Sequence, residues 1–332
     1  MTKRFKKNLL LVVKLTLAAA LLAWVYRKED WSQFANDVKQ ANAWLLAAAF
    51  AAYVVSLATI AVRLQFLLRV QGIHIRMWEL VRLTFLGQLF NSVVPGVVGG
   101  DLVKAFYVAK HTPHKAAAMV TVFVDRLTGL AALVLQAIGM LAVVLAMGMD
   151  TLENLWQAAI AAVSAVGALA VMSAFLFSSR LRKLFHLQKL YSRLSVAHHF
   201  ALAGDAARKF RQHLGLLLWA VVMTIAAQAL WIAGVALAGA SLSIEVAWHS
   251  YFIYIPLIYI IGSVPITPGG LGVVEGLYAG FFVGVERITR LAAVARALDI
   301  LRGLPGLLVV ITGTKLPKAE QLEAELASEE PD

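Results

Sequence analysis

Two stretches rich in proline and glycine end in a carboxylate, and each interrupts a hydrophobic run. Residues 91–104 read NSVVPGVVGGDLVK, and residues 265–276 read PITPGGLGVVEG. Glycines let a backbone turn tightly and approach a ligand. A helix that begins after them directs free N–H groups and a positive dipole end toward an anion such as phosphate. Matched pairs of such broken segments are typical of a transporter's binding site, so the sequence predicts anion binding here.

A purely structural interpretation stays open for each stretch. The breaks could be packed inside the protein without binding anything, with Asp101 as an ordinary N-cap. Backbone groups in such a break need a polar cavity or protein around them, because lipid cannot form hydrogen bonds with them.

Charged residues also occur inside helices whose neighbours are almost all apolar. Charge in hydrocarbon is unfavourable, so these residues are expected to face the interior and pair with one another. Arginine can bind phosphate oxygens through two parallel hydrogen bonds, which favours Arg126 and Arg302 as ligand-binding groups. Arg63 is expected instead to reach the cytoplasmic headgroups. The charged residues within these helices are Asp125, Arg126, Arg296, Asp299 and Arg302.

These observations define one predicted substrate-binding site. Asp101, Glu275, Arg126 and Arg302 should converge around the tips of the two glycine-rich loops. The full predicted set is Asn91, Pro95, Gly99, Gly100, Asp101, Lys104, Asp125, Arg126, Pro268, Gly269, Gly270, Glu275 and Arg302.

Other chemistries have little support in the sequence. There is no cysteine, so disulfides and Cys-ligated zinc are excluded. The histidines at 111, 114, 198 and 199 lack the spacing of known metal motifs, and neither a P-loop nor a dinucleotide fingerprint is present. We therefore expect no metal, no cofactor, no catalytic residues and no ATPase activity.

Composition places the chain in a membrane. Hydrophobic residues make up 61% of its 332 residues, only 15% are charged, and the mean hydropathy is +0.77. Such a chain is an all-α polytopic membrane protein. The net charge of +11 is attributed to cytoplasmic lysine and arginine beside an anionic leaflet rather than to nucleic-acid binding.

The hydrophobic pattern predicts about six full transmembrane helices and two re-entrant helical hairpins. The hairpins cover about residues 77–112 and 248–286, which the bias of basic residues toward the cytoplasm favours over full crossings. The N-terminus and C-terminus are then both cytoplasmic, in a bacterial inner membrane. The full spans are expected at about 8–26, 43–70, 115–147, 155–177, 214–238 and 288–312.

Three spans and one hairpin in each half predict an inverted repeat. The offsets agree, since Asp101 precedes Glu275 by 174 residues and Arg126 precedes Arg302 by 176. The expected divisions are repeat 1 at 1–150, repeat 2 at 151–314 with a cytoplasmic basic connection at about 179–213, and a polar acidic tail at 315–332.

Three motifs resemble a known family. They are N-x-x-x-P-G-x-x-G-G-D at 91–101, D-R-x-x-G at 125–129 and P-x-x-P-G-G-x-G-x-x-E at 265–275. Together they resemble the transmembrane region of lysylphosphatidylglycerol synthases, also called the flippase-like family, which includes the multiple peptide resistance factor. The resemblance implies a membrane region that moves aminoacylated phosphatidylglycerol between leaflets. The soluble aminoacyl-transfer domain is not expected here, so synthase activity is not implied.

The leading hypothesis is a lipid translocator whose cargo carries a phosphate headgroup: an anionic or aminoacylated phospholipid, or another lipid phosphate. One alternative is a membrane scaffold or accessory subunit for a lipid-modifying or glycosyl-transferring enzyme. Another is an enzyme with Asp101 and Glu275 as acid and base, which requires the two carboxylates to converge on one bond. A cavity at the hairpin tips would favour transport, and a dry contact would favour the scaffold. A homodimer or an enzyme partner is possible in either case.

Overall fold

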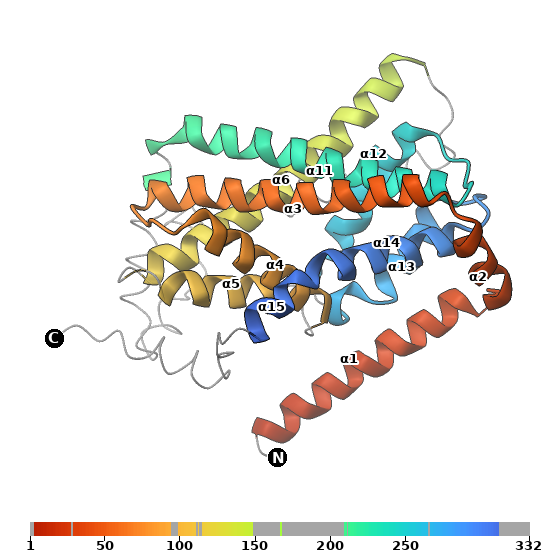
Figure 1. Ribbon diagram of the computed structural model, residues 1–332, viewed down its shortest axis with the longest axis horizontal. Coiled ribbons are helices and arrows are strands. Elements are labelled where there is room, and N and C mark those ends of the chain that lie inside the picture. The colour runs from red at the N-terminus through yellow and green to blue at the C-terminus, as the bar shows by residue number, and fades with distance from the viewer. Residues whose placement is uncertain are drawn as a thin grey trace.

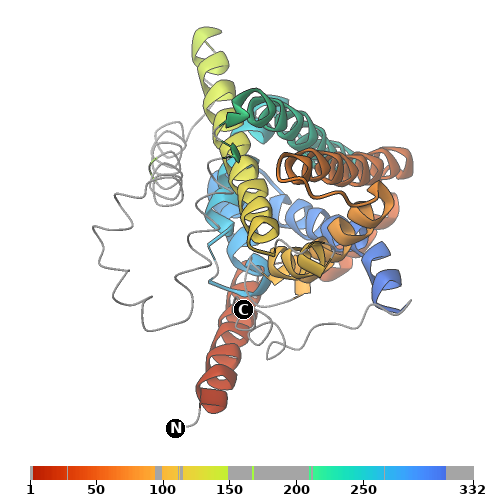
Figure 2. The ribbon, with the colours of Figure 1, turned by 90° about the vertical axis from the view of Figure 1, so that its left-hand side faces the viewer.

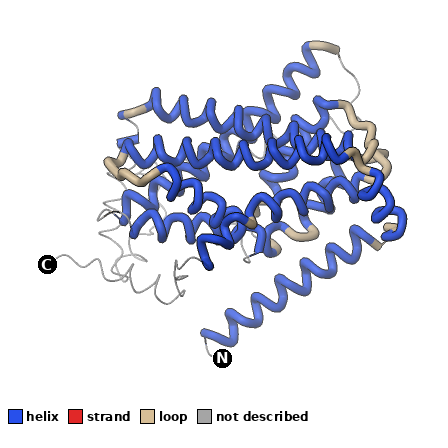
Figure 3. The backbone as a smooth tube through the Cα atoms, in the orientation of Figure 1, coloured by secondary structure: helices blue, strands red, loops and turns tan. Residues whose placement is uncertain are grey.

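The computed structural model describes residues 3–27, 29–93, 99–110, 112, 115–148, 167, 209–210, 212–264 and 266–311. Helices account for 85% of the structure, and these residues contain no strand (Figure 3). The predicted all-α fold is therefore confirmed. Three predicted segments lie outside the described residues: the span at 155–177 except for residue 167, most of the basic connection at 179–213, and the tail at 315–332.

Three described helices are long and apolar enough to cross a membrane. They are α3 (Ala43–Val70), residues Ala117–Ala146 of α6 (Lys115–Ala146), and α11 (Leu214–Ser241). α3 and α11 have 28 residues each. At about 1.5 Å per residue such a helix is about 42 Å long, which exceeds the roughly 30 Å hydrocarbon core of a bilayer.

α3 and α11 pack against each other in opposite directions (Figure 2). At one end the Asn42 backbone N–H donates to the Ser241 carbonyl oxygen at 3.1 Å. At the other end Leu67 of α3 shares a hydrophobic cluster with Ala220 of α11. The side chain of Asn42 also caps the first turn of α3, which fixes where the helix begins.

The first broken segment forms two short helices, α4 (Met77–Val93) and α5 (Gly99–Lys110). They contact each other and extend from the left end of the bundle toward its middle (Figure 1). The interruption falls where the sequence predicts it. Residues 94–98, which include Pro95, lie outside the described part of the chain.

The second broken segment forms α12 (Trp248–Gly262), the 3₁₀ turn η1 (Pro268–Gly270) and α13 (Val273–Phe281). α12 and α13 approach the middle of the bundle from the end opposite to α4 and α5 (Figure 1). Gly269 and Gly272 have φ values of +56° and +78°, a backbone conformation that side chains disfavour. The glycines are thus needed for the turn itself.

The last predicted span, at about 288–312, is not one continuous helix. α14 (Ile288–Gly303) ends at Leu304, and α15 (Pro305–Ile311) begins at the following proline. Proline lacks a backbone N–H and clashes with the preceding turn, which interrupts a helix. Gly303 and Gly306 lie against the backbone of α4, so the break also lets this segment approach the first broken segment closely.

The N-terminal helices pack along the second half of the chain. α1 (Lys3–Tyr26) contacts η1 and α13, where a Cβ at Gly272 would lie 2.4 Å from the Leu21 Cβ. The short α2 (Trp31–Gln40) buries none of its residues. Its N-cap is Asp30, and a hydrogen bond from the Ser32 side chain lowers the pKa of that carboxyl.

An ion-pair cluster joins α2 to the first turn of α14. Arg290 donates to Glu29 at 2.5 Å and to Asp37, and Thr289 donates to Glu29 at 2.8 Å. Arg287 lies 3.7 Å from Asp37. The cluster fixes the α1–α2 connection to the end of α14 that lies far from the broken segments' tips.

Candidate functional site

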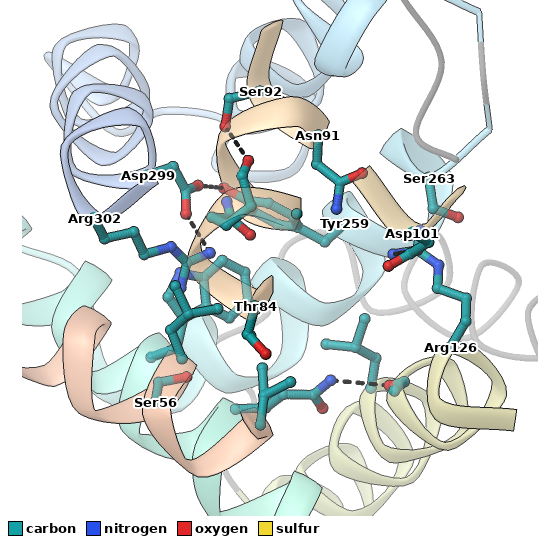
Figure 4. A pocket seen from close by; sticks show the side chains of 18 of the residues that line it. Ser56, Thr84, Asn91, Ser92, Asp101, Arg126, Tyr259, Ser263, Asp299 and Arg302 are labelled. Carbon is teal, nitrogen blue, oxygen red and sulfur yellow. Dashed lines mark hydrogen bonds and ion pairs between the residues drawn. The ribbon is translucent and has the colours of Figure 1, made fainter. Parts of the chain in front are cut away.

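A cavity of about 250 Å³ lies where the two broken segments meet, and its wall combines apolar side chains with charged and polar ones (Figure 4). Its wall includes residues from α3, α4, α5, α6, α11, α12, η1, α13 and α14. Arg302 and Asp299 lie on one side of it, and Arg126 and Asp101 lie on the opposite side. Both halves of the chain therefore contribute charged groups to one cavity.

The two broken segments touch directly beside this cavity. A Cβ at Gly269 would lie 2.9 Å from the Ser92 carbonyl oxygen and 3.1 Å from that of Asn91, so the contact requires glycine. The Asn91 side chain accepts a hydrogen bond from the Gly100 N–H at 2.9 Å. The Gly100 N–H is therefore bound to Asn91 rather than free for a ligand.

A buried cluster around Asp125 forms one end of the cavity. Arg63 donates to Asp125 Oδ1 from Nε at 2.9 Å and from a terminal nitrogen at 2.6 Å. Lys104 donates to Oδ2 at 3.1 Å, and Thr224 accepts a further bond from Arg63. Arg63 is only 3% exposed. The prediction that Arg63 reaches the headgroups is wrong, because an opposite charge within the bundle compensates its burial.

Asp101 and Arg126 form a looser pair at the cavity wall. Their closest nitrogen and oxygen atoms are 3.7 Å apart, and Lys104 lies 3.5 Å from the same carboxylate. The Arg126 side chain is 35% exposed. Arg126 is thus held less tightly than Arg63 and retains donors that could face a ligand.

Aromatic and acidic side chains surround Arg302 of α14. Its terminal nitrogen lies 2.5 Å from Asp299, which also accepts a hydrogen bond from the Tyr259 hydroxyl at 2.8 Å. Its guanidinium lies over the rings of Tyr53 and Trp231, 5.1 and 6.0 Å from their centroids. Arg302 Nε is buried and has no hydrogen-bond partner.

Glu275 does not line the cavity. One carboxylate oxygen accepts from the Gly272 N–H at 2.8 Å and so caps α13, and the other accepts from Arg296 Nε at 2.7 Å. Arg296 also donates to the carbonyl oxygens of Gly269 and Gly270. Arg296 therefore holds the glycine turn in place, and it is Arg296 rather than Glu275 that faces the cavity.

The structure thus brings together most of the predicted site. Of the four residues expected to converge, Asp101, Arg126 and Arg302 line one cavity and Glu275 lies behind Arg296. Pro95 lies outside the described residues. The predicted residues that line the cavity are Asn91, Asp101, Lys104, Asp125, Arg126, Gly269 and Arg302. Gly100, Pro268, Gly270 and Glu275 do not line it, and Gly99 is the first residue of α5.

Several residues of the cavity wall were not predicted to belong to it. Arg63 and Arg296 could have been found from the general tendency of intramembrane charges to pair within a bundle. Neutral side chains carry no comparable signal, because serine, glutamine and tyrosine occur throughout the chain. The neutral polar members are Ser56, Thr84, Gln88, Ser92, Gln228, Tyr259 and Ser263.

The cavity has an excess of positive charge. Among the described residues, five basic side chains and three carboxylates line it, and Glu275, bound to Arg296, adds a fourth carboxylate. With every group in its usual charged form, the sum is +1. The basic residues are Arg63, Lys104, Arg126, Arg296 and Arg302, and the carboxylates are Asp101, Asp125 and Asp299.

Comparison with known proteins gives the family. No curated protein matches the chain. Residues 11–313 match the family described as the lysylphosphatidylglycerol synthase TM region, and this range contains the long apolar helices and both broken segments. The chain therefore belongs to the lysylphosphatidylglycerol synthase transmembrane-region family, a membrane-embedded family associated with lipids.

Proposed function

We propose that this protein is a lipid translocator without enzymatic activity, and that it binds a phosphate headgroup in the cavity between the two broken segments. The observation that carries the proposal is the positively charged cavity at the point where the segments meet. A dry contact there would have favoured a scaffold. Arg126 and Arg302 face the cavity from opposite sides and offer the planar donors that phosphate oxygens accept.

The size of the cavity limits what enters it. At about 30 Å³ per water molecule, 250 Å³ holds about eight waters. This space suits a headgroup but not two acyl chains, so the chains of a bound lipid remain among the helices or in the bilayer. Alternating exposure of such a site to the two leaflets would move the headgroup across without covalent chemistry.

We propose further that the segments are re-entrant hairpins in an inverted repeat of a bacterial inner-membrane protein, with both termini cytoplasmic. Supporting this, α3 and α11 have equal length and opposite direction. Six residues separate α3 from α4 and α11 from α12, and a broken segment follows in each half. Basic residues 69, 76 and 110 cluster at the ends of α3, α4 and α5, where they would face anionic lipid.

The proposal is tested in liposomes that contain purified protein and a fluorescent phosphatidylglycerol, with no nucleotide. Reduction of the outer-leaflet fluorophore by dithionite measures how quickly lipid crosses. We expect dithionite to reduce all of the fluorescent lipid in proteoliposomes, but only the half in the outer leaflet of protein-free vesicles. Folded and correctly inserted protein that moves no lipid would contradict translocation and favour the scaffold alternative.

A further inference from the structure

We propose that α2 is a membrane-surface anchor, whose apolar face lies in the interface between water and the lipid tails. The partner that this face fits is the headgroup region of a bilayer rather than a protein. With the termini on the proposed cytoplasmic side, this interface belongs to the outer leaflet. The inference follows from the exposed tryptophans, from the position of α2 in the chain and from the chemistry of its three faces.

Exposed tryptophans lie near helix ends in the described part of the chain. Of the seven tryptophans that the structure describes, six are exposed, and each of these lies in the first six or the last three residues of a helix. Tryptophan is enriched where a membrane meets water, because its ring is apolar and its N–H is polar. The six therefore mark two membrane interfaces, and α2 lies at one of them (Figure 1). Trp24, Trp31, Trp44 and Trp248 belong to the end of the bundle that contains α2, and Trp78 and Trp219 belong to the opposite end.

The chain keeps α2 close to the membrane. The helix that follows it, α3, is long and apolar enough to span a bilayer, and only residues 41 and 42 separate the two helices. At about 3.8 Å between consecutive Cα atoms, the last residue of α2 lies within about 11 Å of the first residue of α3. Trp44, on the first turn of α3, is exposed. α2 therefore lies where α3 emerges from the lipid.

One face of α2 is apolar and another is polar. Trp31, Ala35 and Val38 are spaced by four and three residues, so they share a face of the helix, and all three are exposed. The Trp31 ring also contacts the rings of Tyr26 and Phe34, which extends the apolar surface. An exposed apolar face beside a polar one is typical of a helix that lies in the plane of a membrane interface. The polar face consists of Ser32, Asn36 and Lys39, which are also exposed.

The third face of α2 binds the helix that carries part of the cavity wall. Gln33 and Asp37 accept hydrogen bonds from Arg290 of α14, and Glu29, which precedes α2, accepts another at 2.5 Å. α14 continues from there to Arg302 at the cavity. The contact leaves the apolar face of α2 directed away from the protein. α2 therefore joins the first turn of α14 to the membrane surface.

Fluorescent labels on single cysteines test the inference separately from translocation. Ala35→Cys and Asn36→Cys form a matched pair, because the two residues are adjacent and exposed but lie on the apolar and the polar face. The chain has no cysteine of its own, so an NBD maleimide labels only the introduced residue. The labelled full-length protein is placed in lipid nanodiscs, where both sides of the membrane are accessible. Quenching is then measured with a nitroxide lipid labelled just below its headgroup and, separately, with iodide in the water.

The two labels should respond in opposite ways. We expect the label at position 35 to emit at shorter wavelength and to be quenched by the nitroxide lipid, and the label at position 36 to be quenched by iodide. The ratio of nitroxide to iodide quenching should be several-fold higher at position 35. An equal ratio at both positions would overturn the inference. A label at position 35 that neither reagent quenches would assign the face to a protein contact, which also overturns it.

Removal of the apolar side chains tests whether they hold α2 at the interface. Trp31→Ser combined with Val38→Ser keeps the contacts with Arg290 and should shift the label at position 35 from nitroxide quenching toward iodide quenching. Trp219→Ser is the control, because Trp219 is 55% exposed, close to the 58% of Trp31, but lies at the opposite end of the bundle. Unchanged quenching in the double variant would refute the anchoring role of these side chains. Protein whose α2 shows the expected quenching but which moves no lipid would support the anchor while refuting translocation.

Discussion

The charged residues of the cavity differ in how firmly the protein holds them. Arg63, Lys104 and Asp125 form a buried cluster in which each charge has a close partner. Arg126 is half-exposed and lies 3.7 Å from Asp101. A group that is already fully paired stabilises the fold, whereas a loosely paired one can exchange its partner for a ligand. We therefore assign a structural role to the Asp125 cluster and a binding role to Arg126.

This division predicts effects of different size for two carboxylates of the cavity wall. Asp125→Asn leaves the buried Arg63 without an opposite charge and Lys104 with only the more distant Asp101, and it should lower the free energy of unfolding by about 3–5 kcal/mol. Asp101→Asn removes only longer, partly exposed contacts and should cost less than about 1 kcal/mol. Unfolding in mixed detergent micelles measures both. Equal stability of the Asp125→Asn variant and the wild type would refute the structural role.

At the level of elements, the close packing of α4 and α5 depends on small residues. A Cβ at Gly100 would lie 1.9 Å from the Gly87 carbonyl oxygen, so the start of α5 lies directly against the backbone of α4. The same proximity brings the Gly100 N–H to the Asn91 side chain. The contact fixes Asp101 and Lys104, on the first turns of α5, at the cavity.

Gly100→Ala should therefore disrupt the first broken segment. The added methyl group meets backbone rather than a movable side chain, so we expect a loss of at least about 3 kcal/mol in the free energy of unfolding. Gly139→Ala is the control, because Gly139 lies on α6 with nothing within 4 Å of the added Cβ. That variant should be as stable as the wild type or slightly more stable, since alanine favours helices. A Gly100→Ala variant as stable as Gly139→Ala would contradict the packing described here.

The elements could be predicted from the sequence better than the contacts between them. Proline and glycine determine where a helix ends, so both interruptions were placed correctly, and Pro305 carried the same signal for the break after α14. The ion-pair partners could not be predicted in the same way, because any arginine on an apolar helix can pair with any carboxylate that the fold brings near it. Arg302 pairs with Asp299 on its own helix, which the spacing allowed. Arg296 reaches Glu275, which lies 21 residues earlier in the chain and is near it only in the folded state.

For the molecule as a whole, the proposed re-entrant arrangement predicts which ends of the broken segments share a side of the membrane. Arg76 precedes α4 and Lys115 begins α6, whereas Glu245 precedes α12 and Glu286 follows α13. The chain has no cysteine, so single cysteines can be introduced without background. An impermeant maleimide should label positions 76 and 115 only from the cytoplasm, and positions 245 and 286 only from outside.

The same labelling distinguishes hairpins from crossings. If α4 and α5 together crossed the membrane, positions 76 and 115 would be labelled from opposite sides. Labelling of positions 245 and 286 from opposite sides would exclude a hairpin in the second half. Either result would contradict the proposed inverted repeat.

The central claim is that the cavity between the broken segments binds the lipid headgroup during translocation. Arg126→Gln and Arg302→Gln each remove a cation that faces the cavity. Arg287→Gln is a matched control, because Arg287 is similarly exposed and also lies 3.7 Å from a carboxylate, but outside the cavity. Arg126→Gln and Arg287→Gln should insert and fold like the wild type. Arg302→Gln leaves the buried Asp299 carboxylate without its ion-pair partner and should be less stable, so its rate is compared at equal amounts of folded protein.

The most direct measurement is the rate at which each variant translocates fluorescent phosphatidylglycerol in liposomes of equal protein content. We predict that Arg126→Gln and Arg302→Gln slow translocation by about tenfold or more, as expected for a lost charge-assisted hydrogen bond. Arg287→Gln should translocate at the wild-type rate. Translocation by both cavity variants at the wild-type rate would contradict the claim that the headgroup passes through this cavity.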